Sequence, residues 1–288
     1  MIYRLLAINI DGTLLRSNGR MQPATKEAIE FVKKKDVYVT LFTNRHYQSA
    51  KKIAKALKLN TLLITHSGAF VADNVELPFY NKRIREERTF NIVHILEQFD
   101  CNVRIVHERY SIGNRKKVNT NLVGKTLVHP SDPLFYPVQF VESLSDFLRD
   151  EPVEATKIEV FFSNHEEKKK VKQTIVNAFE GIDILDPQEQ RLIIVLEGVS
   201  KANSLRYLGK HLGIKTNEMV VIGDSYDDKE AIEQAGLGVA MGNAPFELKR
   251  AADWVTRTND ENGVAYMIKE HFRMQQRPGF LAVYKGNK

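Results

Sequence analysis

The feature that most constrains the fold is the alternation of two hydrophobic periods near the start of the chain. Short apolar runs at residues 4–9, 37–42 and 61–65 are typical of buried strands, and the segments between them carry apolar side chains at helical spacing. A strand–helix–strand order with short connections favours a parallel sheet with helices on its faces. The sequence therefore predicts a doubly wound, Rossmann-like α/β sheet, in which ligands bind at the carboxyl ends of the strands.

The end of the chain repeats this pattern. Helical spacing at residues 200–212 and 228–235 alternates with strand-like runs at 219–222, 238–241 and 254–256. We expect these strands to complete the sheet that the first segment begins.

The middle of the chain indicates a second domain. Helical segments, one of them at 140–148, alternate there with strand-like segments in an order that begins with a helix. A chain of 288 residues allows about two domains of roughly 150 residues each. We predict a Rossmann-like core made of residues 1–82 and 191–288, with residues 83–190 inserted as an α+β domain.

Composition limits the classes of function. The net charge of +6 suits an anionic ligand, but no basic stripe with interleaved aromatic residues indicates nucleic-acid binding. No segment approaches the ~18 consecutive apolar residues of a membrane span, and the N-terminus is not typical of a secretory signal. We expect a cytoplasmic protein without a membrane partner.

The single cysteine, Cys101, excludes an internal disulfide and a Cys-rich metal site, so any metal must bind to carboxylates.

Polar residues follow the first two predicted strands. Asn9 and Asp11 should converge, because residues two apart on an extended segment point the same way, and Gly12 then turns the chain away. Thr43 and Asn44 open a helix whose free backbone N–H groups favour an anion. Each pattern alone is equally typical of an ordinary turn or helix cap.

Two later motifs add a cation and three carboxylates. Lys201 stands at the start of a predicted helix, where its ammonium group would lie over the same sheet edge. Asp224, Asp227 and Asp228 crowd together after a predicted strand. Because like charges are costly to bury together, a hard cation such as Mg²⁺ is the natural explanation, and an exposed acidic loop is the alternative.

In this order, the four motifs resemble those of the haloacid dehalogenase-like superfamily of phosphatases, and within it the Cof-like branch, over nearly the whole chain. The segments at 65–69, 198–201 and 238–244 are similar to further motifs of that branch, with Ser67 in place of an asparagine. The resemblance implies that the inserted domain is a cap, placed between the second and third motifs, which closes over the site and selects the substrate.

The resemblance also implies a reaction. In the family, a first aspartate attacks phosphorus and forms an aspartyl-phosphate, and its position here is Asn9. Asp11 corresponds to the general acid and base. Mg²⁺ would lie among the side chain at position 9, the carbonyl of Asp11 and the carboxylate of Asp224, with support from Asp228 through water.

The same resemblance assigns the remaining site residues to phosphate or substrate binding. Thr43 and Lys201, with the backbone near Ile10 and Asn44, would bind the phosphoryl group and stabilise its charge. Asp227 belongs to this set and stands where the family has an asparagine. We hypothesise that Asp227 partly restores the charge that Asn9 removes from the cation site.

Asn9 is the main departure from the family. Its amide oxygen is a poor nucleophile and a neutral metal ligand, and losing an attacking group can cost roughly six orders of magnitude in rate. Three explanations stay open: a natural branch that has lost or rerouted catalysis, with water attacking directly; an engineered change; or a natural enzyme that turns over slowly.

The sequence thus predicts a Mg²⁺-dependent phosphatase of small phosphorylated metabolites with impaired turnover. Sugar phosphates and the flavin-pathway compound 5-amino-6-(5-phosphoribitylamino)uracil are the substrates that the resemblance suggests. The alternative is an inactive pseudo-phosphatase that binds a phosphorylated ligand or a partner. His107, Arg109 and Tyr110 are candidates for substrate contacts in the cap, with a structural role equally open. An apolar tail at 278–283 is expected to pack on the core or on a neighbouring subunit, and the oligomeric state is undetermined.

Overall fold

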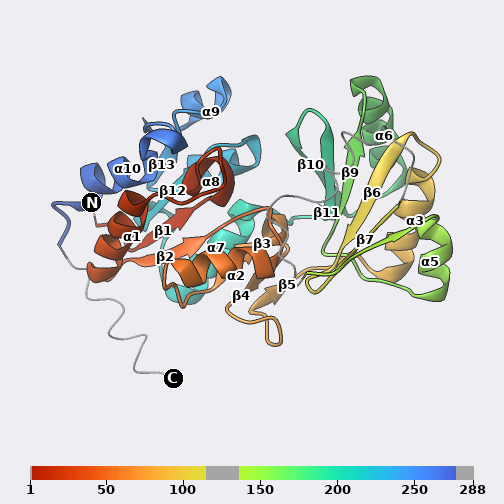
Figure 1. Cartoon of the computed structure of the whole chain (residues 1–288), viewed down its shortest axis with the longest axis horizontal. Helices are drawn as coiled ribbons and strands as arrows, with labels where there is room; N and C mark the ends of the chain where they lie inside the picture. Colours follow the sequence, from red (N-terminus) through yellow and green to blue (C-terminus); the bar gives the residue numbers. More distant parts are fainter. Residues whose placement is uncertain (1, 115–135, 277–288) are drawn as a thin grey trace.

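The chain folds into two units that lie side by side, each built on its own sheet (Figure 1). This description rests on a computed structural model, which describes residues 2–114 and 136–276. The apolar tail at 278–283 lies outside the described residues.

The first unit is a five-stranded parallel sheet in the order β14-β13-β12-β1-β2. Its strands are β1 (Leu5–Ile8), β2 (Tyr38–Leu41), β12 (Met219–Gly223), β13 (Leu237–Ala240) and β14 (Trp254–Val255). β1 pairs with β2 on one side and with β12 on the other, so the two ends of the chain meet in the middle of one sheet. The predicted doubly wound α/β core is confirmed.

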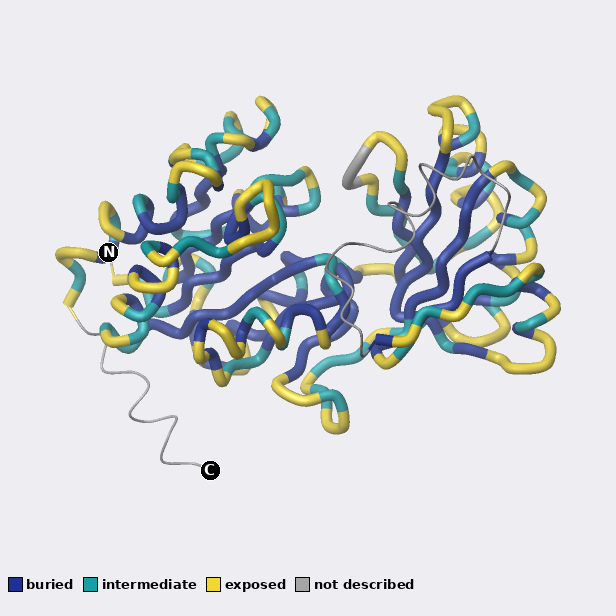
Figure 2. The backbone as a smooth tube through the Cα atoms, viewed as in Figure 1, coloured by how far each residue is buried: buried dark blue, intermediate teal, exposed yellow. Residues whose placement is uncertain are grey.

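Helices cover both faces of this sheet, which explains why its strands read as continuous apolar runs. Leu6 and Ile8 pack in one buried cluster with α1, α2 and α10, while Leu5 and Ala7 pack in another with α7, α8 and α9. The helices are α1 (Pro23–Lys34), α2 (Tyr47–Ala56), α7 (Lys201–Leu212), α8 (Lys229–Gln234), α9 (Phe246–Ala251) and α10 (Gly263–Phe272). Figure 2 shows the buried strands between these half-exposed helices.

The strand predicted at 61–65 does not extend the parallel sheet as a regular ladder. It touches β2 through a single parallel bridge between Phe42 and Ile64. The turn at His66–Gly68 returns the chain at once, so its neighbour on the other side is antiparallel. This small sheet consists of β3 (Leu63–Thr65), β4 (Phe70–Ala72) and β5 (Tyr80–Asn81).

The second unit is a six-stranded sheet in the order β10-β11-β9-β6-β7-β8, with three helices on its far side from the core (Figure 1). The strands are β6 (Cys101–Val106), β7 (Ser111–Asn114), β8 (Val138–Val141), β9 (Lys157–Phe162), β10 (Ile182–Gln188) and β11 (Arg191–Leu196). The helices are α3 (Glu86–Leu96), α5 (Leu144–Asp150) and α6 (His165–Ala178).

Two boundaries differ from those predicted for this unit. The helix expected at 140–148 begins only at Leu144, because the chain is still paired in β8 up to Val141. The second core segment was expected from residue 191, but β11 lies between β9 and β10. The antiparallel turn after β10 keeps the chain in the six-stranded sheet until Leu196.

The two units touch through polar and apolar contacts. The hydroxyl oxygen of Thr156, immediately before β9, lies 3.0 Å from a ring nitrogen of His66. The ammonium of Lys157 donates a 2.7 Å hydrogen bond to the carbonyl of Asn44. Ala69 packs in one buried cluster with Ile193 of β11. The sheet face without helices therefore faces the core.

None of the helices in the described ranges has the length and hydrophobicity of a membrane span.

Candidate active site

The residues predicted to form the site meet at the carboxyl ends of three neighbouring strands. Asn9 follows β1, Thr43 and Asn44 follow β2, and Asp224 follows β12. Lys201 is the first residue of α7, whose N-terminus is capped by Ser200. This convergence follows from the parallel order of β2, β1 and β12.

Asn9 is buried and uses both ends of its amide. Its oxygen accepts a 2.7 Å hydrogen bond from the backbone N–H of Ile10. Its nitrogen lies 3.0 Å from a carboxylate oxygen of Asp224, 3.0 Å from one of Asp228 and 3.4 Å from the carbonyl oxygen of Asp11. Because the oxygen faces an N–H donor, the nitrogen must face the acceptors, and the amide donates to the two carboxylates at the centre of the site.

The turn after Asn9 depends on Gly12. Its φ angle is +69°, which glycine adopts without strain, and an added Cβ would collide with the Asp224 carboxylate. Thr13 then donates a 2.7 Å hydrogen bond from its hydroxyl to Asp224, and Asn243 donates one of 2.8 Å to the carbonyl of Gly12. The turn thus holds Asp224 against β1.

Lys201 and Asp228 form a buried ion pair. The ammonium of Lys201 donates to one carboxylate oxygen of Asp228 and, at 2.7 Å, to Asp227. The other oxygen of Asp228 accepts from Asn9 and from the backbone N–H groups of Asp224 and Ser225 at 3.1 Å each. Burial alone would lower the pKa of Lys201, but the two carboxylates raise it, so the lysine is a cation.

The side chain of Asp227 is largely inaccessible to solvent, and both of its oxygens accept hydrogen bonds. It accepts a 2.7 Å hydrogen bond from the Asn44 amide and one of 2.6 Å from the Ser225 hydroxyl, in addition to its ion pair with Lys201. Burial raises its pKa, but Lys201 and these hydrogen bonds outweigh that effect and lower it to about 2. Asp227 therefore lies with Lys201 and Asn44, and its hydrogen bonds do not reach Asn9.

Asp224 and Asp228 repel each other at the centre of the site. Burial and the neighbouring charge of Asp228 raise the pKa of Asp224 to about 7, and burial also raises the pKa of Asp228. The positive charge of Lys201 acts in the opposite direction on both. The positive charge of Lys201 is therefore too small to offset the effect of burial and mutual repulsion on the two carboxylates.

Asp11 points away from this pair. Its half-exposed carboxylate accepts hydrogen bonds from Arg45, of 2.7 Å from Nε and 2.5 Å from Nη2. Arg45 also donates a 3.1 Å hydrogen bond to the hydroxyl of Ser49 on α2. The bidentate contact fixes the direction of this half-exposed carboxylate.

The residues expected to bind the phosphoryl group lie close together, but some of their polar groups already form hydrogen bonds within the protein. The hydroxyl of Thr43 accepts a 3.1 Å hydrogen bond from the N–H of Arg45, and the N–H of Ile10 is bonded to Asn9. Asn44 donates to Asp227, while its buried amide oxygen has no hydrogen-bond partner.

The three cap residues singled out from the sequence lie in a separate cluster. Arg109 forms a 2.7 Å ion pair with Glu76, and His107 stacks on Tyr110 with ring centres 4.6 Å apart. His107 also lies 3.4 Å from a carboxylate oxygen of Glu108. The hydroxyl of Tyr136 also lies 2.6 Å from the carbonyl oxygens of His107 and Tyr110. Within the described residues, none of these contacts is with the strand-end site.

The oxygen atoms around Asn9 fit a divalent cation. In the described ranges, no group of three or more His, Cys, Asp or Glu side chains could hold a metal ion. Oxygens of Asp224, Asp228 and the Asp11 carbonyl nevertheless surround one point, which the amide nitrogen of Asn9 now approaches. Mg²⁺ prefers oxygen ligands and retains several waters. The set fits such an ion if the Asn9 amide turns its oxygen toward it.

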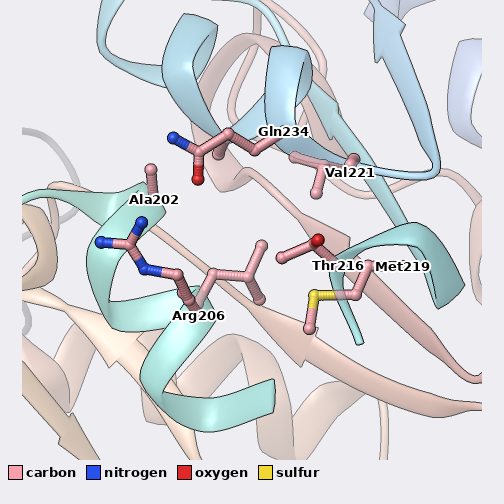
Figure 3. Close-up of a pocket in the computed structure, with 9 residues that line it drawn as sticks. Ala202, Arg206, Thr216, Met219, Val221 and Gln234 are labelled. Carbon is pink, nitrogen blue, oxygen red and sulfur yellow. The ribbon is translucent and has the colours of Figure 1, made fainter. Parts of the chain in front are cut away.

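A small cavity next to this region is a different feature. It has a volume of about 10 Å³, room for about one water molecule, and lies between α7, α8 and β12 (Figure 3). Apolar side chains such as Leu205 and Val221 form much of its wall. It is too small for a metabolite.

Sequence reasoning missed two residues at the site. Arg45 follows Thr43 by two positions at a strand end, the spacing that already selected Asn9 and Asp11, and this signal could have identified it. Lys157 opens a strand in which charged or polar residues alternate with Ile158 and Val160. That alternation indicates a polar sheet face, but not that the lysine reaches Asn44.

Comparison with known proteins defines the class. A sequence model of the haloacid dehalogenase-like hydrolases matches residues 6–268. The chain therefore belongs to the haloacid dehalogenase-like hydrolase family, which confirms the predicted family. Its relatives include proteins named as phosphatases, and the predicted enzyme class is confirmed at that level.

Particular relatives cover nearly the whole chain. The stress response protein YhaX of Bacillus subtilis is 60% identical over 281 residues, which are 98% of this chain and 97% of that protein. The 5-amino-6-(5-phospho-D-ribitylamino)uracil phosphatase YcsE of the same organism is 29% identical over 266 residues, 92% of this chain and 94% of that protein. A solved haloacid dehalogenase-like hydrolase from B. subtilis superimposes with a TM-score of 0.80 at 26% identity, over 93% of this chain and 99% of that one.

Proposed function

We propose that the protein is a Mg²⁺-dependent phosphatase of small phosphorylated metabolites, with turnover impaired by Asn9. One observation carries this proposal: Asp224, Asp228, Lys201 and the side chain at position 9 are bonded to one another at the carboxyl ends of β1 and β12. With a divalent cation on the carboxylates, such a set can hold a phosphoryl group and balance its charge.

The cation would be held by the carboxylates of Asp224 and Asp228 and by the carbonyl of Asp11. When bound, Mg²⁺ neutralises charge on phosphoryl oxygens. The hypothesis that Asp227 restores charge at this position loses support, because both of its oxygens are bonded elsewhere. Asp227 instead orients Lys201 and Asn44.

The chain's own residues would bind and orient the phosphoryl group. An ammonium group has three N–H donors, and two of those on Lys201 are used by Asp227 and Asp228, so the third can reach a phosphoryl oxygen. The hydroxyl of Thr43 and the backbone of Asn44 border the same position. The N–H of Ile10 joins them once the Asn9 amide releases it.

Asp11 would act as the general acid and base. Its half-exposed carboxylate is oriented by Arg45. It can protonate the leaving ester oxygen as the P–O bond breaks. Asn9 has no carboxylate with which to attack phosphorus, so a water molecule attacks directly as that bond breaks. The phosphate formed then returns one proton of that water to Asp11, and the reaction is slow.

The substrate would be selected by the six-stranded unit, which acts as the cap. A sugar phosphate or a flavin-pathway phosphate is the substrate class that the family and the relative YcsE support. The cytoplasmic location and the absence of a nucleic-acid partner stay predictions, and the oligomeric state is undetermined.

A second function is favoured by the bonding of Asn9. Its amide donates to both Asp224 and Asp228, which stabilises the carboxylates without a cation. A chain with this site could act as a pseudo-phosphatase that binds a phosphorylated ligand and releases no phosphate.

Phosphate release from a panel of sugar and flavin-pathway phosphates, measured with Mg²⁺ for the native chain and Asn9→Asp, separates the two functions. Turnover by the native chain supports the phosphatase. Turnover by the variant alone identifies position 9 as the only missing group. If neither releases phosphate while phosphorylated ligands still bind, the phosphatase proposal is wrong and the binding function holds.

A further inference from the structure

A strained turn lies between the two units, directly after β3 (Figure 1). His66 and Ser67 have φ angles of +52° and +61°, in the left-handed region that residues other than glycine rarely adopt. Such residues cost free energy and persist only where the surrounding structure holds them, most often at functional sites. The contacts of His66, which is completely buried, indicate what this turn holds in place.

His66 forms two hydrogen bonds with the segment between β2 and α2. Its backbone N–H donates a 2.9 Å hydrogen bond to the carbonyl of Arg45. Its ring nitrogen Nε2 accepts one of 3.1 Å from the backbone N–H of Tyr47, the first residue of α2. That N–H is one of those that have no acceptor within the helix. The two bonds fix the backbone on both sides of this segment, from which the Arg45 side chain reaches Asp11.

The other ring nitrogen of His66 bonds to the six-stranded unit. Nδ1 lies 3.0 Å from the hydroxyl oxygen of Thr156. This hydroxyl donates its own hydrogen to the carbonyl of Val106, at 2.8 Å, so its oxygen accepts from the ring. Burial lowers the pKa of His66 well below its ordinary value, so the ring is neutral, with its one proton on Nδ1. The same neutral ring therefore donates to the cap and accepts from α2.

The cap contacts the same segment at two further points. The ammonium of Lys157 donates a 2.7 Å hydrogen bond to the carbonyl of Asn44. The ring of Tyr136 stacks on that of His46, with ring centres 3.8 Å apart and an angle of 10° between the planes. The contacts of the cap thus converge on residues 44–47, the segment that orients the proposed general acid.

We propose that His66 is a positioning residue, which couples the placement of the cap to the orientation of Asp11 by Arg45. While the hydroxyl of Thr156 accepts from Nδ1, the ring is held where Nε2 can bind the N–H of Tyr47. Without that hydroxyl, the buried N–H of the ring has no acceptor, which is costly, so the ring shifts and releases the segment. This inference rests on the proposed function and deepens it, because the cap then acts on the catalytic geometry.

Amide hydrogen exchange of the native chain, followed by NMR, tests the coupling without any turnover. Thr156→Val removes the cap hydroxyl and changes no residue of the core. We expect the amide of Tyr47 to exchange about tenfold faster relative to the amides of β1, since a tenfold change corresponds to about 1.4 kcal/mol. Thr89→Val is the matched control, because the buried hydroxyl of Thr89 donates to the carbonyl of Ile84 within the cap. It should leave the exchange at Tyr47 unchanged.

Two esters with different leaving groups test the consequence for the reaction. The alkoxide of sorbitol 6-phosphate needs a proton from the general acid, whereas the nitrophenolate of p-nitrophenyl phosphate leaves readily without one. Phosphate release is measured with Mg²⁺ in the native chain and in the Asn9→Asp background. We expect Thr156→Val and His66→Asn to lower kcat/KM about tenfold for sorbitol 6-phosphate and much less for p-nitrophenyl phosphate. Asparagine tolerates the left-handed φ of this position, but its shorter amide does not reach Tyr47.

The outcomes separate the coupling from the proposed function. Thr156→Ser keeps the hydroxyl and should behave as the native chain in both experiments. Unchanged exchange at Tyr47 in Thr156→Val would overturn the coupling and leave the proposed function in place. Equal losses of kcat/KM for the two esters would overturn the positioning role, because a general loss of packing affects both alike. If neither the native chain nor Asn9→Asp releases phosphate from either ester, the proposed function is wrong, and the role of His66 in that reaction falls with it.

Discussion

Asn9→Asp tests the role of the amide in the resting site. The substitution keeps the shape of the side chain but replaces an N–H donor with a third carboxylate beside Asp224 and Asp228. The amide donates two hydrogen bonds of 3.0 Å to these charged acceptors. Each hydrogen bond to a charged group contributes about 1.5–3 kcal/mol, so we expect the variant without metal to lose about 3–6 kcal/mol of unfolding free energy.

Thermal unfolding followed by circular dichroism measures this loss. At about 2–4 °C per kcal/mol for a chain of this size, the unfolding temperature in EDTA should fall by about 10 °C. Mg²⁺ should restore most of the lost unfolding temperature in the variant, because a ligand stabilises the folded state that binds it. It should raise the unfolding temperature of the native chain much less.

A second substitution isolates the charge effect. Asp224→Asn, made in the Asn9→Asp background, returns one amide and two carboxylates to the site and should recover much of the lost stability in EDTA. Equal unfolding temperatures for the native chain and Asn9→Asp in EDTA would refute the reasoning, since the amide would then contribute nothing to holding the carboxylates together.

Three further substitutions test other parts of the structure. Gly12→Ala should cost about 2–4 kcal/mol in urea denaturation, because it combines a positive φ with a collision against Asp224; a loss below about 0.5 kcal/mol would contradict the close approach. Asp228→Asn should cost about 3–5 kcal/mol, since it removes a charge that Lys201 faces in the interior; Glu233→Gln, on the exposed face of α8, is the control and should cost almost nothing. Burial holds the pKa of His66 well below its ordinary value, so the folded state binds fewer protons than the unfolded state below about pH 6.5. Unfolding free energy should therefore decrease on acidification below that pH and be unaffected by this group above it, and His66→Gln should flatten the slope measured by urea denaturation. An unchanged slope would show that His66 is not buried as a neutral ring.

The parts of the fold that depend on local pattern were predicted correctly. The runs at 4–9, 37–42 and 219–222 are mostly apolar at their buried positions, and their parallel order follows from the helices between them, so the central strands of the core were predictable. The wrong predictions concern residues whose secondary structure or sheet depends on the strand with which they pair. Residues 140–141 continue a helix-like pattern but pair in β8, and β11, which the predicted boundary at residue 191 assigned to the core, pairs with β9.

The site shows the same division. Asn9, Thr43, Asp224 and Lys201 could be placed together from the sequence because each stands at a strand or helix end, and parallel strands bring such ends to one edge. Spacing along the chain does not predict which atoms of these residues form hydrogen bonds with one another. The bidentate contact of Arg45 with Asp11, for example, depends on the conformation of the segment between β2 and α2.

The sequence thus determined the family, the sheet and the set of polar residues at its edge, because these follow from periodicity and short motifs. The bonding among those residues came from the tertiary structure. That the Asn9 amide faces two carboxylates, and that Lys157 reaches the carbonyl of Asn44 across the two units, depends on segments more than a hundred positions apart. Packing brings such segments within hydrogen-bond distance, and no local pattern encodes the direction from which they approach.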